Sequence, residues 1–449
     1  MARKIVSPTF AEIGHTGLSH YSGYITEEFL RELSGSRWRR VIREMLANDP
    51  VINAMLFAVE MLVRQVEWEL TPASDQNADE EVKEFFKGAL FSDMSSSWED
   101  TLSEVLSFLP WGWAYHEVCY KKRSGPSDDP SQNSKFSDGR IGWRKWPIRA
   151  QESLLRWDFD PNGGVQGMIQ QAAPDFRDIT IPIERALLFR TTSHKNNPEG
   201  KSLLRACYRP WYFKQLVENY EGVGIERDLA GVPMMKVPAE LFDANASNEH
   251  KAIKAYCETI VTGIKANEQA GLLLPSDVYD GTSIPQYEFA LVGTGSRRLI
   301  DTDKVISRKN QEILMRLLAD FIILGHEQVG SFALSGDKTN LFGIALGAWL
   351  DSIADVINRH AIPRLGRLNG MSAESMPTLK HKDIEKVDLD ALGQYLQRIA
   401  LAGVRVTPDM AAHAVEQAGM PVPDDHSELI NPEPPEPPDD GEDDDEEDE

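Results

Sequence analysis

Apolar residues recur at intervals of three and four along several stretches of the chain, a pattern that predicts amphipathic helices. One such helix is predicted to begin after Asn48-Asp49-Pro50, where a proline follows a residue type that often caps helices. Further helices are predicted over 78–90 and directly after the serines at 95–97. This part of the chain is therefore expected to be helical, after an N-terminal arm over 1–35 that contains one short helix.

At Trp111 the pattern changes to alternation of apolar and polar residues, which is typical of strands. The polar insert over 124–139 is predicted to be a hairpin loop. Further strands are expected over 141–148, 153–159, 165–171 and 186–191, with a tight turn at Asn162-Gly163. Helices followed by paired strands predict an α+β fold for the first 195 residues.

Two long helices, expected over 201–230 and 301–324, bracket a small unit over 231–298. Pro210 lies inside the first of them and is expected to bend it or to mark its true start. The small unit is predicted to contain a helix over about 247–266 and strands at VPMMKVP, GLLLP and YEFALV. At ~1.5 Å per residue, the second long helix would measure about 35 Å.

A glycine-rich segment, GHEQVGSFALSGDKTN, follows the second long helix and is expected to form a flexible loop. The next helix is predicted over 341–360 and is expected to end at Pro363. Two short helices near 388–401 and 408–418 complete the part of the chain that is expected to fold.

Composition adds that this is a multidomain chain without a disulfide framework. It has 449 residues, of which 41% are hydrophobic, so two or three domains are expected. The three cysteines are far apart in the sequence and form no CxxC pair, which disfavours a zinc site. No apolar run reaches the roughly 20 residues that a membrane span requires, and no signal peptide is visible, so an intracellular protein is expected.

The formal net charge of −24 is unevenly distributed. Residues 431–449 carry 12 acidic and no basic side chains, which is half of the imbalance, and their composition predicts disorder. The remainder is only moderately acidic. Any contact with DNA is therefore expected to be weak and independent of sequence.

One segment resembles a nucleotide-binding loop. HKNNPEGKSLL, at 194–204, follows a predicted strand and precedes a helix, as a P-loop does. However, Lys195 stands where the first glycine is required, and Pro198 removes a backbone donor from the loop. A helix start capped by Ser202 is the preferred interpretation.

No combination of residues indicates catalysis. His116-Glu117 and His326-Glu327 both lack the second histidine of a metalloprotease helix. The cations Lys304, Arg308 and Lys309 could form a basic stripe along one helix, although a solvated face of an amphipathic helix is the preferred interpretation from these residues alone. We expect neither an enzyme, nor a metal site, nor a cofactor.

Two long runs resemble portal proteins from the Mu-like branch of tailed bacteriophages. NPEGKSLLRACYRPWYFKQLVENYEGVGIERDLAGVPMMKVP is similar to the middle of these proteins, and DTDKVISRKNQEILMRLLADFIILGHEQVGSFALSGDKTNLF to their second half. The runs occur in the right order, and with the flanking layout the resemblance covers roughly residues 30–420. The N-terminal arm, the polar insert and the acidic tail lie outside it.

The resemblance implies a portal fold with wing, stem, clip and crown regions, assembled as a dodecameric ring. It divides the chain into an N-terminal arm (1–35), wing (36–200), first stem helix (201–230), clip (231–298), second stem helix (301–324), channel loop (325–340), wing or crown helix with linker (341–384), crown (385–420) and acidic tail (421–449). Under this layout the channel loop includes Gly325, Gly330, Ser331 and Gly336, and the expected DNA contacts are Lys304, Arg308, Lys309 and Lys338.

The resemblance also implies the biological role. Portal subunits form the passage through which DNA enters and leaves the capsid, and they perform no chemistry themselves. The implied partners are other copies of the chain, double-stranded DNA bound without sequence specificity, the terminase large subunit, the major capsid protein or scaffold, and a head–tail adaptor. The implied location is the portal vertex of the virion, after assembly in the host cytoplasm and without a membrane.

Two other functions compete with this one. A P-loop-like ATPase of the packaging motor would have to bind nucleotide through Lys201. A head–tail adaptor would also form a ring, but adaptors are usually much shorter and would not need the first 200 residues of this chain.

Overall fold

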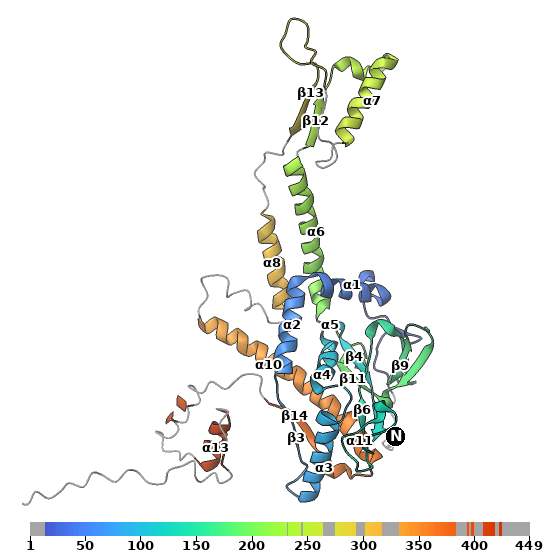
Figure 1. Cartoon of the computed structure of the whole chain (residues 1–449), viewed down its shortest axis with the longest axis vertical. Coiled ribbons are helices and arrows are strands. Elements are labelled where there is room, and N and C mark those ends of the chain that lie inside the picture. The colour runs from blue at the N-terminus through green and yellow to red at the C-terminus, as the bar shows by residue number, and fades with distance from the viewer. Residues whose placement is uncertain are drawn as a thin grey trace, which may run out of the picture. The chain divides into compact units, whose positions relative to one another are not determined.

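The computed structural model describes residues 14–230, 232–243, 246–263, 274–292, 301–316, 332–382, 393–394, 397–398, 407–417 and 422–423. The chain divides into two compact units. The first comprises Met1–Arg64 and Leu70–Leu379, and the second comprises Gln65–Glu69 and Lys380–Glu449. Figure 1 shows the elements of the first unit, which contains most of the described residues.

The first unit opens with a small hairpin and three helices. The hairpin pairs β1 (His20–Tyr21) with β2 (Tyr24–Ile25), and the helices are α1 (Gly35–Asn48), α2 (Pro50–Arg64) and α3 (Asn77–Lys87). Asp49 ends α1 and caps α2, because its Oδ1 accepts the backbone N–H groups of Val51 and Ile52 at 3.0 and 3.1 Å. The helix boundary predicted at Asn48-Asp49-Pro50 is confirmed.

The helix predicted after the serines is also confirmed. It is α4 (Trp98–Leu106), and the Ser97 hydroxyl accepts from the Asp100 N–H at 3.0 Å, as a capping serine should. A short α5 (Phe108–Trp111) follows and ends at Gly112, which has φ +93°. A side chain at Gly112 would strain this turn and would press on the backbone of Lys201 and Ser202.

The strands between Trp113 and Arg190 form three small antiparallel sheets. These are β4 (Trp113–Glu117) between β7 (Ile148–Arg149) and β11 (Ala186–Arg190); β9 (Val165–Gln171) between β8 (Leu154–Phe159) and β10 (Asp178–Pro182); and the pair β5 (Cys119–Lys122) with β6 (Ile141–Lys145). Trp113, Tyr115, Trp157 and Met168 bury a common core between the first two sheets. The sequence did not predict β10. Only Ile181 of its five residues is buried, so the strand carries no clear apolar alternation.

The polar insert over 124–139 is the β5–β6 hairpin loop, as predicted, and it is anchored at its base. Lys121 lies beside Asp93 with Nζ and Oδ1 3.3 Å apart, and both side chains are almost fully buried. Asp93 also accepts from the Ser134 hydroxyl at 2.8 Å and from the Lys135 N–H at 2.7 Å. These bonds fix the middle of the loop to the helical part of the unit.

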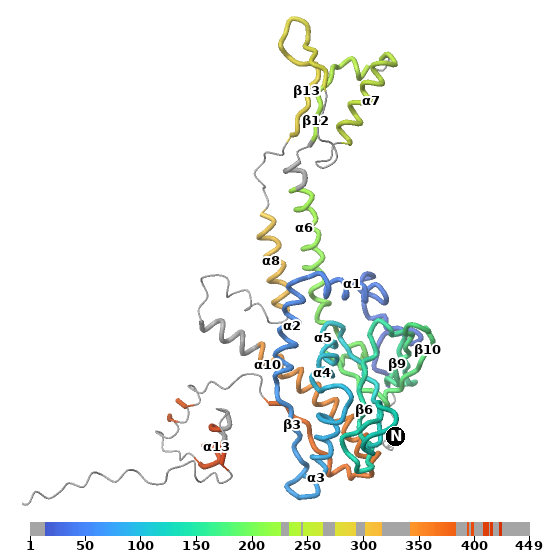
Figure 2. Tube along the Cα trace, in the orientation of Figure 1, coloured from blue at the N-terminus to red at the C-terminus, as the bar shows by residue number. Residues whose placement is uncertain are grey.

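The two long helices are α6 (Leu204–Ala230) and α8 (Thr302–Met315), which run side by side in Figures 1 and 2. Near one end Cys207 approaches the Ile313 carbonyl, and near the other the Thr302 hydroxyl donates to Glu221 at 2.6 Å, so the helices are antiparallel. Pro210 lies within α6, which starts six residues earlier, so the interpretation of Pro210 as the helix start is wrong.

The small unit between these helices is an α/β module. β12 (Val232–Lys236) pairs antiparallel with β13 (Glu288–Val292), and Lys236 and Glu288 are joined across the pair at 2.8 Å. α7 (Asn248–Gly263) packs against the turn Ala239–Phe242 and against β12. The expected strand at GLLLP falls largely outside the described residues.

The helix expected over 341–360 is longer and begins earlier. α10 spans Phe332–Val356, a π-helical turn continues it over Ile357–Ala361, and α11 follows at Ile362–Leu368. The prediction that Pro363 ends this helix is wrong. Pro363 lies in the first turn of α11, where the absent N–H would have no helical partner in any case.

The second unit is described only in part. The chain passes between the units within β3 (Trp68–Thr71) and β14 (Thr378–His381). Inside the second unit, Trp68 contacts His381 edge to face at 5.7 Å, and α13 (Pro408–Gln417) confirms one of the two expected short helices. The other falls mainly outside the described residues, and so does the acidic tail.

No helix in the described part of the chain is long and apolar enough to cross a bilayer by itself. The bent pair Gly35–Asn48 and Pro50–Arg64, which turns by 84°, meets that test of length and composition when the two are taken together.

Candidate functional site

The P-loop-like segment uses its backbone donors internally. The N–H of Lys201 donates to the Thr191 hydroxyl at 2.9 Å, and that of Leu203 donates to the Leu109 carbonyl at 3.1 Å. A phosphate-binding loop needs such N–H groups directed into one open concavity. Here the N–H groups of Lys201 and Leu203 instead donate to acceptors within the protein.

Ser202 has the capping role that the sequence predicted. Its buried hydroxyl donates to the Pro110 carbonyl and accepts the Leu204 N–H at 3.0 Å, at the residue where α6 begins. Gly200 precedes it with φ +55° and packs against the Gly112 carbonyl, where an added side chain would collide. The segment is therefore a tight strand-to-helix connection.

His116 lies in the core and contacts no solvent. Its Nδ1 is 2.8 Å from the Trp146 carbonyl, and burial lowers the pKa of His116 to about 4. The adjacent Glu117 forms an ion pair with Arg149. Over the described residues, no group of three or more His, Cys, Asp or Glu side chains could hold a metal ion. His326-Glu327 lies outside those residues.

Two of the three cations predicted on the second long helix lie four residues apart and exposed. The Lys304 side chain is 84% exposed and lies 3.2 Å from Asp301, and Arg308 is also exposed. Lys309 differs, because its side chain is only 19% exposed and its amine pairs with Glu312 at 2.7 Å. Lys304 and Arg308 thus remain available for a weak anionic contact, whereas Lys309 is mostly neutralised.

The expected channel loop is partly helical. Gly325, Gly330 and Ser331 lie outside the described residues, but α10 begins at Phe332 and includes Gly336 and Lys338. The prediction of a loop is therefore wrong from residue 332 onward. A glycine inside a helix costs only about 1 kcal/mol, which the many backbone bonds of a 25-residue helix outweigh.

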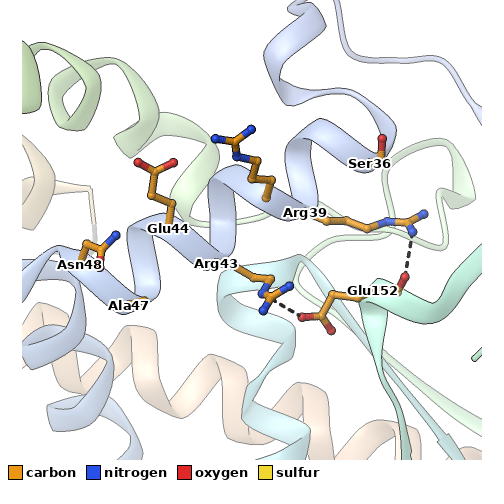
Figure 3. Close-up of a pocket in the computed structure, with 8 residues that line it drawn as sticks. Ser36, Arg39, Arg43, Glu44, Ala47, Asn48 and Glu152 are labelled. Carbon is orange, nitrogen blue, oxygen red and sulfur yellow. Dashed lines mark hydrogen bonds and ion pairs between the residues drawn. The ribbon is translucent and has the colours of Figure 1, made fainter. Parts of the chain in front are cut away.

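A basic helix face that the sequence interpretation did not single out lies on α1. A shallow pocket there is lined by Ser36, Arg39, Arg40, Arg43, Glu44, Ala47, Asn48 and Glu152 (Figure 3). Arg39 donates to the carbonyls of Glu152 and Leu154 at 2.8 and 2.7 Å. Arg43 is 3.8 Å from the Glu152 carboxylate. The run SRWRRVIRE contained the signal, because Ser36, Arg40, Arg43 and Ala47 share one helix face.

Comparison with solved structures identifies similar folds. A chain in the "neck of empty GTA particle computed with C6 symmetry" matches with a TM-score of 0.51 and 11% identity, covering 86% of this chain and 95% of that one. A chain in the "virion of native gene transfer agent (GTA) particle" matches with a TM-score of 0.51 and 10% identity, over 88% and 95%. A chain in the "neck of native GTA particle computed with C12 symmetry" gives 0.51 and 11%, over 86% and 94%. At these identities the likeness concerns the fold.

The family comparison is more specific than the fold. Residues 39–416 match the family described as "Portal protein of Mu bacteriophage", which includes both long helices, the module between them and α13. That family is structural rather than enzymatic. The chain therefore belongs to the portal proteins of Mu-type bacteriophages.

Proposed function

We propose that this chain is the subunit of a ring that surrounds the passage for double-stranded DNA at one vertex of a phage capsid. As a portal-family member it is a structural virion protein and not an enzyme. The observation that carries the proposal is the antiparallel pair α6 and α8, which brackets a separate α/β module in a chain that matches the family over 39–416. In this arrangement α6 leads from the wing to the module, and α8 leads back from the module.

A ring is supported by the apolar side chains that the single chain leaves exposed. On α6 these include Tyr212, Phe213, Tyr220, Val223 and Ile225, and on the module they include Tyr256 and Leu291. Large apolar side chains that one copy leaves exposed can be buried against a neighbouring copy in an assembly. A closed ring requires two different contact faces on each copy. We take the ring to be dodecameric, and a neck relative of the same fold is described with C12 symmetry.

The passage is proposed to hold DNA only weakly. Each phosphate paired with a fixed cation releases counterions and adds affinity, so a passage that lets DNA slide needs few such pairs. Lys304 and Arg308 fit that requirement best among the predicted contacts, Lys309 is a weaker candidate, and Lys338 is kept as a candidate by its place near the start of α10. The loop role is proposed for 325–331 together with the first turns of α10, which hold Gly336.

The remaining partners are assigned by region. The module of β12, α7 and β13 is the proposed docking site for the terminase large subunit and later for a head–tail adaptor. The wing is the proposed contact with the capsid protein or scaffold. Nucleotide hydrolysis would belong to the terminase, because the 194–204 segment has committed its backbone donors.

The test is the assembly state of the purified chain. Native mass spectrometry and negative-stain images are expected to show a holed ring, and ATP binding is expected to be undetectable. Deleting 326–331, which ends before α10, should leave the ring intact and reduce DNA packaging or retention. A compact monomer that binds ATP, and loses that binding on Lys201→Ala, would overturn the proposal in favour of an ATPase.

A further inference from the structure

α1 is amphipathic, and its two sides have different environments. Ile42 and Met45 are fully buried, and with Trp38 they pack against α6 and α8 residues that include Leu204 and Ile313. The other side carries Arg37, Arg40 and Arg43, all exposed, which we call the α1 arginine face. The apolar side therefore fixes α1 to the base of the two long helices and presents the arginine face outward.

A second set of contacts holds α1 in a defined orientation. The guanidinium of Arg39 donates to the Glu152 carbonyl at 2.8 Å (Figure 3) and to the carbonyl of Leu154, the first residue of β8, at 2.7 Å. Arg39 is thereby used structurally and is only partly exposed. A surface that is already ordered loses less conformational entropy when a partner binds.

The arginine face itself is poorly neutralised. Over the described residues, no carboxylate lies within ion-pair distance of Arg37 or Arg40, and Arg43, whose side chain is 71% exposed, has only Glu152 at 3.8 Å. Exposed arginines bind planar carboxylates through two parallel hydrogen bonds. The free guanidinium groups suit a partner that offers carboxylate side chains.

Two observations favour an acidic protein surface over DNA. The pocket beside the face contains Glu44 and Glu152 among three arginines, so a continuous phosphate backbone would meet carboxylates as well as cations. In addition, the buried side of α1 packs against Leu204 of α6 and Ile313 of α8, so the arginine face lies on the side of α1 that is turned away from α8. Because Lys304 and Arg308 of α8 are the proposed DNA contacts, the arginine face points away from the DNA.

We infer that the α1 arginine face docks an acidic surface of the shell protein that encloses the ring at the vertex. This inference rests on the proposed function, because it takes the DNA contacts to lie on α8. The inference adds a defined contact to the proposed function. In this contact Arg37, Arg40 and Arg43, spaced three residues apart on α1, pair with carboxylates of the shell protein.

The test is portal incorporation into capsids. Arg37→Glu with Arg40→Glu reverses two unpaired charges without touching Arg39. The matched control is Arg367→Glu with Arg398→Glu, which changes the net charge equally at exposed positions on α11 and within 385–420, outside the wing (36–200) and the module of β12, α7 and β13. Each protein is co-expressed with the shell protein and scaffold of the same phage, and the portal-to-shell ratio of purified capsids is measured by quantitative mass spectrometry. Ring assembly and binding to a short DNA duplex at low salt are measured in parallel.

The double reversal is expected to lower incorporation by about tenfold or more, because like charges would then oppose each other across the contact. Rings and duplex binding should match the wild type, and the control should incorporate normally. Unchanged incorporation of intact variant rings would overturn the inference while leaving the proposed function standing. Reduced duplex binding with normal incorporation would assign the face to nucleic acid instead. Wild-type protein that forms no ring and enters no capsid would refute the proposed function as well.

Discussion

Removing the carboxylate of Asp49 should loosen the base of the long helices. Asp49 and Lys214 form an ion pair with Oδ2 and Nζ 2.9 Å apart, and their side chains are only 3% and 5% exposed. The same carboxylate caps α2 through Val51 and Ile52. One side chain thus joins the α1–α2 junction to α6.

The magnitude follows from these two roles. Leaving a buried charge without its partner costs about 3 kcal/mol or more, and losing a helix cap costs about 1 kcal/mol. Asp49→Asn keeps a capping oxygen and should lower the free energy of unfolding by about 3 kcal/mol, and Asp49→Ala by about 4 kcal/mol. Lys214→Met should cost less, about 1–2 kcal/mol, because the carboxylate keeps two N–H bonds at a helix N-terminus.

The assay is urea unfolding followed by tryptophan fluorescence, since Trp211 is buried in the neighbouring cluster. Protein concentration must be held constant, because assembly adds to apparent stability. The double variant Asp49→Asn with Lys214→Met should recover to within about 1 kcal/mol of the wild type, because a neutral pair avoids the buried charge. If Asp49→Asn alone unfolds at the wild-type urea concentration, the ion pair does not pin these helices and the reasoning fails.

Three further expectations can be checked on the same protein. Burial lowers the pKa of His116 to about 4 from its ordinary value of 6.5, so the neutral imidazole contributes fully to stability above pH 6.5, and this contribution of about 3 kcal/mol is lost as the pH falls from 6.5 to about 4. The melting temperature, measured between pH 7.5 and 4.5, should therefore decline less for His116→Gln than for the wild type. Equal declines would contradict this explanation. Asp93→Ala should leave Lys121 buried without its carboxylate and make the 124–139 loop the first site of limited proteolysis, with no new cleavage there counting against the anchoring role. Ser202→Ala should lower the melting temperature by the equivalent of about 1 kcal/mol without affecting ATP binding, and any change in nucleotide affinity would point back to a P-loop.

Local patterns predicted the local structure well. Asp49-Pro50, Ser97 and Ser202 each indicated a helix start, and each is one, because capping depends on a side chain and the backbone two or three residues away. The alternation after Trp111 and the turn at Asn162-Gly163 likewise predicted paired strands. The portal family was identifiable from two long runs of sequence, and the family match confirms it.

Local patterns failed where distant residues decide. Gly336 and Pro363 suggested a loop and a helix end, yet both lie in helices, since a glycine or a first-turn proline costs little beside the bonds of a long helix. β10 forms because β9 offers it hydrogen bonds, although its own side chains are mostly exposed.

The sequence alone thus determined most of the helices and strands and that the chain is portal-like. Only the tertiary structure decided which charged side chains are paired or hydrogen-bonded and which remain exposed. Lys214 is paired with Asp49 and Arg39 donates to the carbonyls of Glu152 and Leu154, whereas Arg37 and Arg40, on the same helix as Arg39, remain exposed. The physical reason is that pairing and burial depend on neighbours brought together by folding, which spacing along one helix does not specify.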